Sequence, residues 1–143
     1  MRISYSEDEQ YPGQFELWQA NCRRSLRGKA GQAALHELEQ ALLALPNERL
    51  LANRLVDSDG DVCALGALAQ FKGHALYLAE GCGLDDDFDF DDDGMEDFGV
   101  ELGMPRLVAW KVVEENDIQL GGPLSPEDRY RRMLAWVQAQ LVT

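Results

Sequence analysis

The residues with the most evident chemistry are the aspartates of the stretch LDDDFDFDDDGMEDFG, residues 84–99. Seven of the nine residues from 85 to 93 are aspartate, and the other two are phenylalanine. Closely spaced carboxylates can hold a divalent cation, or they can imitate the phosphates of a nucleic acid and occupy a basic protein surface. A solvated spacer is the third interpretation of such a stretch.

Only half of a calcium-binding loop is present. A helix–loop–helix calcium site needs oxygen ligands at loop positions 1, 3 and 5, glycine at position 6 and a bidentate glutamate at position 12. Asp89, Asp91, Asp93 and Gly94 satisfy the first half, but position 12 is Val100. Any aspartate-rich stretch supplies alternating carboxylates, so we expect weak divalent binding rather than a specific site.

A partner-binding surface is the interpretation that the aromatic residues favour. A pure spacer does not require phenylalanines among its aspartates, whereas aromatic side chains anchor many protein interfaces. We therefore predict a protein partner with a basic surface, and no direct contact with nucleic acid or an anionic membrane, which the same charge repels. The predicted partner-binding residues are Asp85, Asp86, Asp87, Phe88, Asp89, Phe90, Asp91, Asp92, Asp93, Glu96 and Asp97.

The acidity of the chain is local. At 143 residues the chain is long enough for one domain with its own core, and 45% apolar and 27% charged residues are ordinary for a globular protein. The net charge is −13, and the ten carboxylates of residues 85–101, where there is no lysine or arginine, leave only −3 for the rest. The folded body is therefore expected to be nearly neutral.

The cysteines and histidines do not form a recognisable catalytic or metal motif. Cys22, Cys63 and Cys82 are odd in number and widely spaced, which favours free thiols in a reducing cytoplasm over a disulfide framework. A zinc site with His36 and His74 would need long-range assembly. We predict no metal, no cofactor and no enzymatic activity, with Cys63 as a small buried apolar residue.

Helices are the elements that must position the acidic stretch. Residues 30–45 give the strongest helical pattern, ended by Pro46, and their apolar positions fall on one stripe. The apolar positions of that stripe are Ala34, Leu35, Leu38, Ala41, Leu42 and Leu45.

The sequence DSDGD, residues 57–61, predicts a turn between two short apolar runs, because Gly60 tolerates a positive φ. We expect residues 50–56 to form a strand, or a strand preceded by a helical turn, and residues 62–64 a short return strand. A helix from CALGALAQF follows, in which Gly66 would permit a close contact with another helix. A further helical turn or two is predicted for HALYLAE, residues 74–80.

The last third of the chain predicts two more helices. Pro105 suits the first turn of one, and Asn116-Asp117 are expected to cap its end. The other starts with Ser125 as its N-cap, Pro126 in its first turn and acidic residues beside the helix N-terminus. Its predicted buried face consists of Tyr130, Met133, Leu134, Val137 and Leu141.

These elements predict a mainly α fold: a single compact helical domain over residues 1–143 with at most a small β-hairpin near residues 50–64. Residues 1–13 would be a flexible lead-in and residues 84–99 an acidic loop insert, held against the body by Phe88, Phe90 or Phe98. The cluster of Arg23, Arg24, Arg27 and Lys29 could be a solvated face, bind phosphate, or pair with the acidic stretch in the same chain or in a homodimer.

The segments GDVCALGALA, EEND and SPEDRYRRMLAWV together resemble a family of small bacteriophage and prophage proteins without an established activity. They are also distantly similar to a bacterial domain of unknown function that carries CALGAL and a later Trp-Asn-Asp. The resemblance covers roughly residues 23–82 and 99–141, and the aspartate-rich insert departs from it. It implies a phage setting and no catalytic residues.

The resulting hypothesis is a non-enzymatic protein of the host cytoplasm that binds a host protein through its acidic face. Its most concrete form is an inhibitor of a nucleic-acid-handling defence system, in the manner of an anti-CRISPR protein. A divalent-cation-binding domain and an accessory protein of phage structure or assembly are the alternatives.

Overall fold

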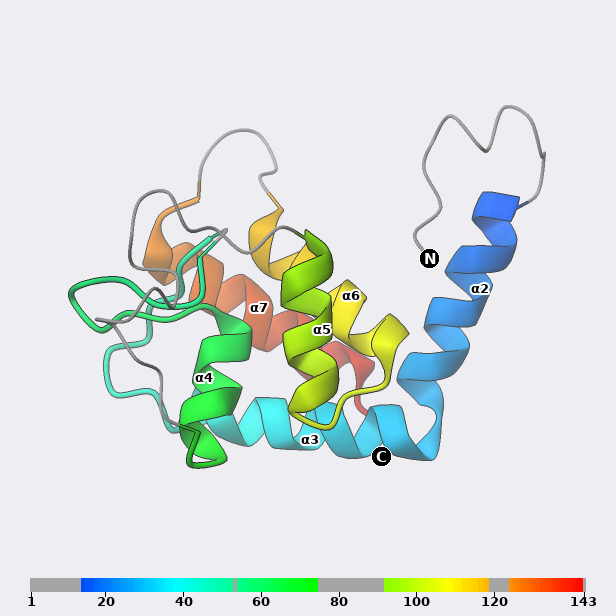
Figure 1. Cartoon of the computed structure of the whole chain (residues 1–143), viewed down its shortest axis with the longest axis horizontal. Helices are drawn as coiled ribbons and strands as arrows, with labels where there is room; N and C mark the ends of the chain where they lie inside the picture. Colours follow the sequence, from blue (N-terminus) through cyan, green and yellow to red (C-terminus); the bar gives the residue numbers. More distant parts are fainter. Residues whose placement is uncertain (1–13, 53, 75–91, 119–123, 143) are drawn as a thin grey trace.

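The apolar stripe predicted within residues 30–45 forms helix α3 (Lys29–Leu43), which runs along the base of the molecule in Figure 1. The helix ends at Ala44, two residues before Pro46, whose ring disfavours a helical residue before it. The stripe faces the rest of the fold, and five of its six predicted members are almost completely buried: Ala34, Leu35, Leu38, Ala41 and Leu42. The sixth, Leu45, follows the helix and is only partly buried.

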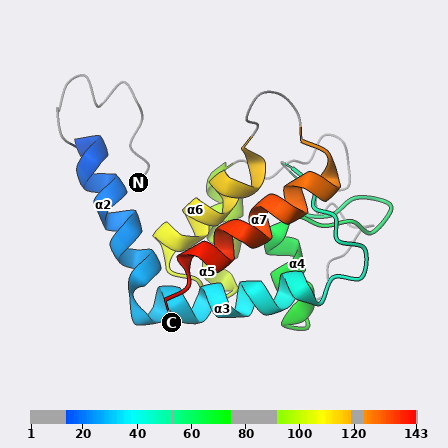
Figure 2. The same cartoon turned by 180° about the vertical axis from the view of Figure 1, so that it is seen from behind.

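The computed structural model describes residues 14–52, 54–74, 92–118 and 124–142, without the side chains of residues 92 and 93. Six helices and no strand occur in these ranges, so the predicted mainly α fold is confirmed. Helices α4 to α7 pack above α3, while α2 rises from one end of it (Figure 1). In Figure 2, seen from behind, α7 lies in front and runs above α3, with which it is in contact.

Helix α2 (Gln14–Arg27) joins α3 through a sharp turn at Gly28. The turn brings the two helices so close that a Cβ on Gly31 would lie 1.9 Å from the carbonyl oxygen of Ser25. Only a glycine fits at this position, which fixes how α2 leaves α3. Further along, α2 contacts the body through α6, and Cys22 and Leu26 are its buried residues.

The predicted hairpin is reduced to a single antiparallel bridge between Val56 and Val62. The turn itself forms as predicted, with Gly60 at a φ of 85°. Regular strands do not form at 50–56 and 62–64, because Leu50 N–H bonds instead to the carbonyl of Pro126 and the chain enters helix α4 (Ala64–Phe71) directly after Cys63. The helical turns predicted within 74–80 lie outside the described residues, apart from His74.

Gly66 allows α4 to approach the hairpin, and not another helix as the sequence suggested. A Cβ at this position would lie 2.6 Å from the carbonyl oxygen of Leu55 and 2.8 Å from the Cβ of Val62. Six of the eight residues of α4 are buried, and all six are Ala, Leu or Gly. The hairpin therefore covers an apolar face of the helix.

Helices α5 (Asp92–Glu101) and α6 (Arg106–Asp117) form a hairpin around Gly103, which has a φ of 102°. Pro105 directly precedes α6 rather than standing inside its first turn. Helix α7 (Pro126–Gln140) begins as predicted, with Ser125 Oγ accepting a hydrogen bond from Asp128 N–H at 3.1 Å. The buried residues of α7 are Arg129, Tyr130, Met133 and Val137.

Asn116 joins four segments in the interior and is only 2% exposed. Its Oδ1 accepts from the N–H of Ala64 at the start of α4, at 3.0 Å, and its Nδ2 donates to the carbonyl of Leu51 at 2.8 Å. Its own carbonyl accepts from Nη1 of the buried Arg129 at 2.6 Å. The predicted role, capping the end of its own helix, is therefore incomplete, since the side chain caps a different helix.

We expect Asn116→Ala to lower the free energy of unfolding by about 2–4 kcal/mol, because it leaves the buried Ala64 N–H and the partly buried Leu51 carbonyl without their partner. Asn21→Ala is the matched control, since Asn21 bonds only the exposed Arg24, and should change it by less than about 0.5 kcal/mol. Urea unfolding of both variants measures the difference. Equal effects would show that the Asn116 bonds contribute nothing beyond a surface contact.

Candidate functional site

The structure describes only one end of the predicted acidic site. Outside the described residues lie Asp85, Asp86, Asp87, Phe88, Asp89, Phe90 and Asp91. Asp92 and Asp93 form the first turn of α5, although their side chains are not described. Glu96 and Asp97 are described in full, and they lie near the middle of the same helix.

Helix α5 corrects the prediction of a loop at residues 92–99, while residues 84–91 of that predicted loop lie outside the described residues. Met95 and Phe98 lie on one side of the helix and pack against the core. Gly99 lies so close to α6 that an added Cβ would be 2.6 Å from the Cβ of Ala109. This apolar contact outweighs the weak helix propensity of the surrounding aspartates and glycines, and it holds the acidic helix against the body.

The helix also contradicts the calcium-loop interpretation. Positions 5 to 12 of the proposed loop are residues 93–100, and all of them are helical. Position 6, Gly94, therefore does not provide the sharp turn that wraps such a loop around an ion. Within the described residues, moreover, no three His, Cys, Asp or Glu side chains converge on a point that could hold a metal.

The described carboxylates of α5 differ in their surroundings. Glu96 is buried, with an exposed fraction of only 9%, and its Oε2 lies 3.7 Å from Nη1 of Arg106. Asp97 is exposed and accepts a hydrogen bond from the same nitrogen at 2.8 Å. Glu101, one turn further on, is exposed and forms no ion pair with a described residue. The helix therefore presents carboxylates to solvent from a fixed position, with a single arginine beside them.

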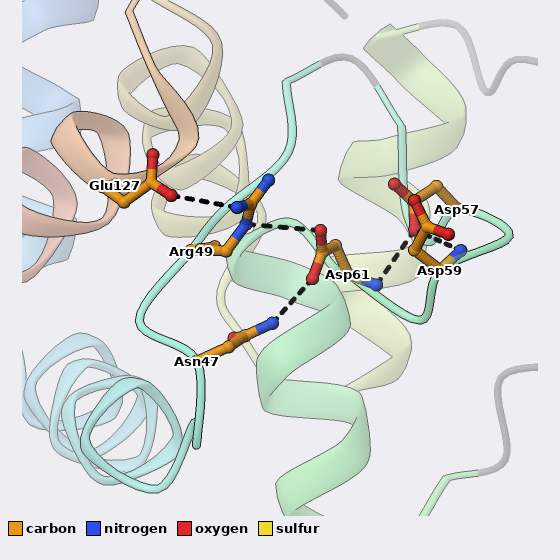
Figure 3. Close-up of polar contacts among 6 residues, drawn as sticks. All are labelled: Asn47, Arg49, Asp57, Asp59, Asp61 and Glu127. Carbon is orange, nitrogen blue, oxygen red and sulfur yellow. Dashed lines mark hydrogen bonds and ion pairs between the residues drawn. The ribbon is translucent and has the colours of Figure 1, made fainter.

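The aspartates of the 57–61 turn have a structural role, as predicted (Figure 3). Asp57 Oδ1 accepts from the N–H groups of Asp59 and Asp61, each at 3.0 Å. Asp61 in turn accepts from Asn47 Nδ2 at 2.6 Å and lies 3.5 Å from Nε of Arg49, which pairs with Glu127 of α7 at 3.0 Å. These contacts tie the turn to the 47–49 segment and to the start of α7.

A hollow of about 740 Å³, here called the aromatic groove, lies between α2, α6 and α7. All three tryptophans of the chain line it. The Trp18 and Trp110 rings meet edge to face with centroids 4.3 Å apart, and Phe15 stacks beside Trp18 at 6.3 Å. The lining residues are Phe15, Trp18, Gln19, Cys22, Arg23, Leu26, Trp110, Lys111, Glu114, Glu115, Ile118, Trp136 and Gln140.

Sequence reasoning missed this groove. Trp18 and Trp110 belong to separate helices, and both side chains are only half-buried. The available signal was that Lys111 directly follows Trp110 and that Arg132 precedes Trp136 by four residues, about one helical turn. Only the fold shows that three separate helices bring these rings together.

The arginine cluster remains open to solvent. Arg23, Arg24, Arg27 and Lys29 are exposed, and none of them forms an ion pair within the described part of the chain. Three of them, with Gly28 and Ala20, line a second and shallower hollow of about 440 Å³ at the corner of α2 and α3.

The two described cysteines are free, buried thiols. Cys63 accepts a hydrogen bond from Gly66 N–H at 3.4 Å and so forms the N-cap of α4, while burial raises its pKa to about 12. Burial also raises the pKa of Cys22, although Lys111 opposes the rise. Nucleophilic catalysis requires the thiolate, which this environment disfavours at both positions.

No protein family, curated protein or solved structure matches this chain. Among the described helices, none combines the length and the apolar character that crossing a membrane requires.

The Cys63 thiol should make stability fall at alkaline pH. Its pKa rises from 9.0 in the unfolded chain to about 12 in the fold, so its contribution is complete below pH 9 and is lost as pH rises toward 12. We expect a loss of about 1.4 kcal/mol per pH unit in this window. Cys63→Ser keeps a side-chain acceptor at the N-cap without this titration and should show a shallower decline. Chemical unfolding at several pH values measures both, and parallel declines would contradict the prediction.

Proposed function

We propose that this chain is a non-enzymatic binding protein that presents an acidic surface to a basic surface of another protein. The observation that carries the proposal is the ten carboxylates, without one lysine or arginine, between residues 85 and 101. A field of one sign steers an oppositely charged partner toward its surface and repels nucleic acid. The proposed contact residues are Asp85, Asp86, Asp87, Phe88, Asp89, Phe90, Asp91, Asp92, Asp93, Glu96 and Asp97.

The packing of α5 supports this proposal. Asp97 and Glu101 lie one turn apart on a helix that Met95, Phe98 and Gly99 hold against the body. Binding of a partner to these carboxylates therefore costs little chain entropy, because the helix that carries them is already held in place. Glu101 forms no ion pair with a described residue, so its carboxylate can pair with a basic residue of a partner.

The most concrete form of the proposal is a partner that itself handles nucleic acid. Carboxylates spaced along a chain can pair with the lysines and arginines that otherwise bind the phosphates of a nucleic acid. Such binding would depend on salt as strongly as nucleic-acid binding does. The resemblance of the CALGAL, EEND and SPEDRYRR segments to small phage proteins suggests a host defence system as the target, within the host cytoplasm. The mechanism would be competition for the basic surface, without a chemical step.

We expect Asp97→Asn/Glu101→Gln to weaken partner retention about tenfold at low salt, because it removes two exposed carboxylates from the contact. Glu48→Gln/Asp59→Asn is the matched control, since it removes two exposed carboxylates outside the acidic stretch and should leave retention unchanged. The measurement is capture of bacterial lysate proteins on the immobilised chain, with duplex DNA as the competing eluant.

The partner should elute with DNA and with rising salt. Replacing all seven aspartates between 85 and 93 by asparagine should abolish capture. If that variant keeps the same partner at every salt concentration, or if both double variants behave alike, the acidic surface is not the binding surface.

A further inference from the structure

The aromatic groove lies on different helices from the acidic stretch and has the composition of a protein interface. Aromatic rings form its interior and charged side chains its rim, which is the usual anatomy of such contacts. We propose that the groove is the contact between two copies of this chain, in which helix α2 of a second copy lies antiparallel to α2 across the mouth of the groove.

The position of α2 makes this contact accessible. In Figures 1 and 2 the start of the helix rises away from the other helices. Phe15, Gln19 and Arg23 follow one another at four-residue intervals along the edge of the groove, and Glu16 lies beside Phe15. Glu16, Gln19 and Arg23 are exposed. A second helix can therefore lie alongside this edge without displacing a part of the described core.

The charges on α2 select an antiparallel arrangement. The first turn carries Glu16, and the second half carries Arg23, Arg24 and Arg27, so the two ends of the helix have opposite signs. A contact with twofold symmetry is reciprocal. If one residue of the first copy touches a different residue of the second copy, the same two positions also touch with the copies exchanged. An axis near Gln19 places each Glu16 beside Arg23 of the other copy, and neither side chain has an ion pair within the described residues.

The rim does not oppose the approach of a second copy. Lys111 pairs with Glu114 at 2.6 Å and with Glu115 at 3.7 Å, and Glu115 also pairs with Arg132 at 3.2 Å. The rim therefore carries both signs in nearly equal number. The acidic stretch, which would repel another copy, lies elsewhere in the chain, and the rest of the sequence has a net charge of only −3.

The charges allow a test by exchange between two variants. Glu16→Arg places two arginines at each contact and Arg23→Glu places two glutamates there, so each variant alone should dissociate about tenfold more readily than the original chain. A mixture of the two restores an opposite pair at both contacts, and should dimerise like the original chain. Lys29→Glu makes the same charge change as Arg23→Glu outside the groove and should leave the dimer unchanged.

Sedimentation equilibrium of the full chain at about 0.15 M salt, where screening extends over about 8 Å, measures these states. We expect a mass of twice 16.0 kDa for the original chain and 16.0 kDa for each variant at the same concentration. Because all three tryptophans line the groove, acrylamide quenching of their fluorescence should fall as the dimer forms. This second readout reports on the groove itself.

Three results would overturn the inference. The original chain could remain monomeric at every concentration, or the mixture of variants could fail to restore the dimer. The third result is a monomeric chain whose tryptophan fluorescence is quenched more strongly by acrylamide after residues 1–13 are removed. That result would mean that these residues of the same chain cover the groove. None of these outcomes affects the acidic surface, because the exchanged residues all lie on α2.

Discussion

The arrangement of the fold depends on hydrogen bonds to the first N–H groups of a helix whose N-terminus is buried in the core. Helix α4 offers almost only Ala, Leu and Gly side chains, and its first N–H groups have no water to bond. The Cys63 thiol serves one of these groups and the Asn116 amide another. Since a buried N–H without a partner costs about 1–3 kcal/mol, the end of α6 must lie against the start of α4.

This constraint places α6 between the two proposed binding surfaces. One side of α6 receives α5, through the close contact of Ala109 with Gly99, and thereby positions the acidic helix. Another side receives α2, through the edge-to-face contact of Trp110 with Trp18, and thereby forms the groove. Both surfaces are therefore supported by a helix whose end is fixed by hydrogen bonds to Leu51, Ala64 and Arg129.

The features that the sequence predicts well are those with local causes. The stripe of α3, the Ser125 cap of α7 and the aspartate turn each depend on residues within one or two turns of the chain. Helix α5 was missed because aspartates and glycines dominate its local propensity, while the contact that stabilises it comes from Ala109 of α6. The Asn116 bonds join residues 52 and 65 positions apart, and the groove joins three helices, so neither has a local signature.

The distribution of charge separates the two proposed interactions. At physiological salt the field of an exposed charge extends over about 8 Å, so each surface acts mainly on what touches it. The acidic stretch would select a partner mainly by charge at its described end, where Asp97 and Glu101 are exposed. The groove would select by shape, because its rings offer apolar area and its α6 and α7 rim charges pair with one another, while the charges of α2 set the direction of the second copy. A chain that is strongly acidic as a whole can thus contact a copy of itself at a site where its net charge has little effect.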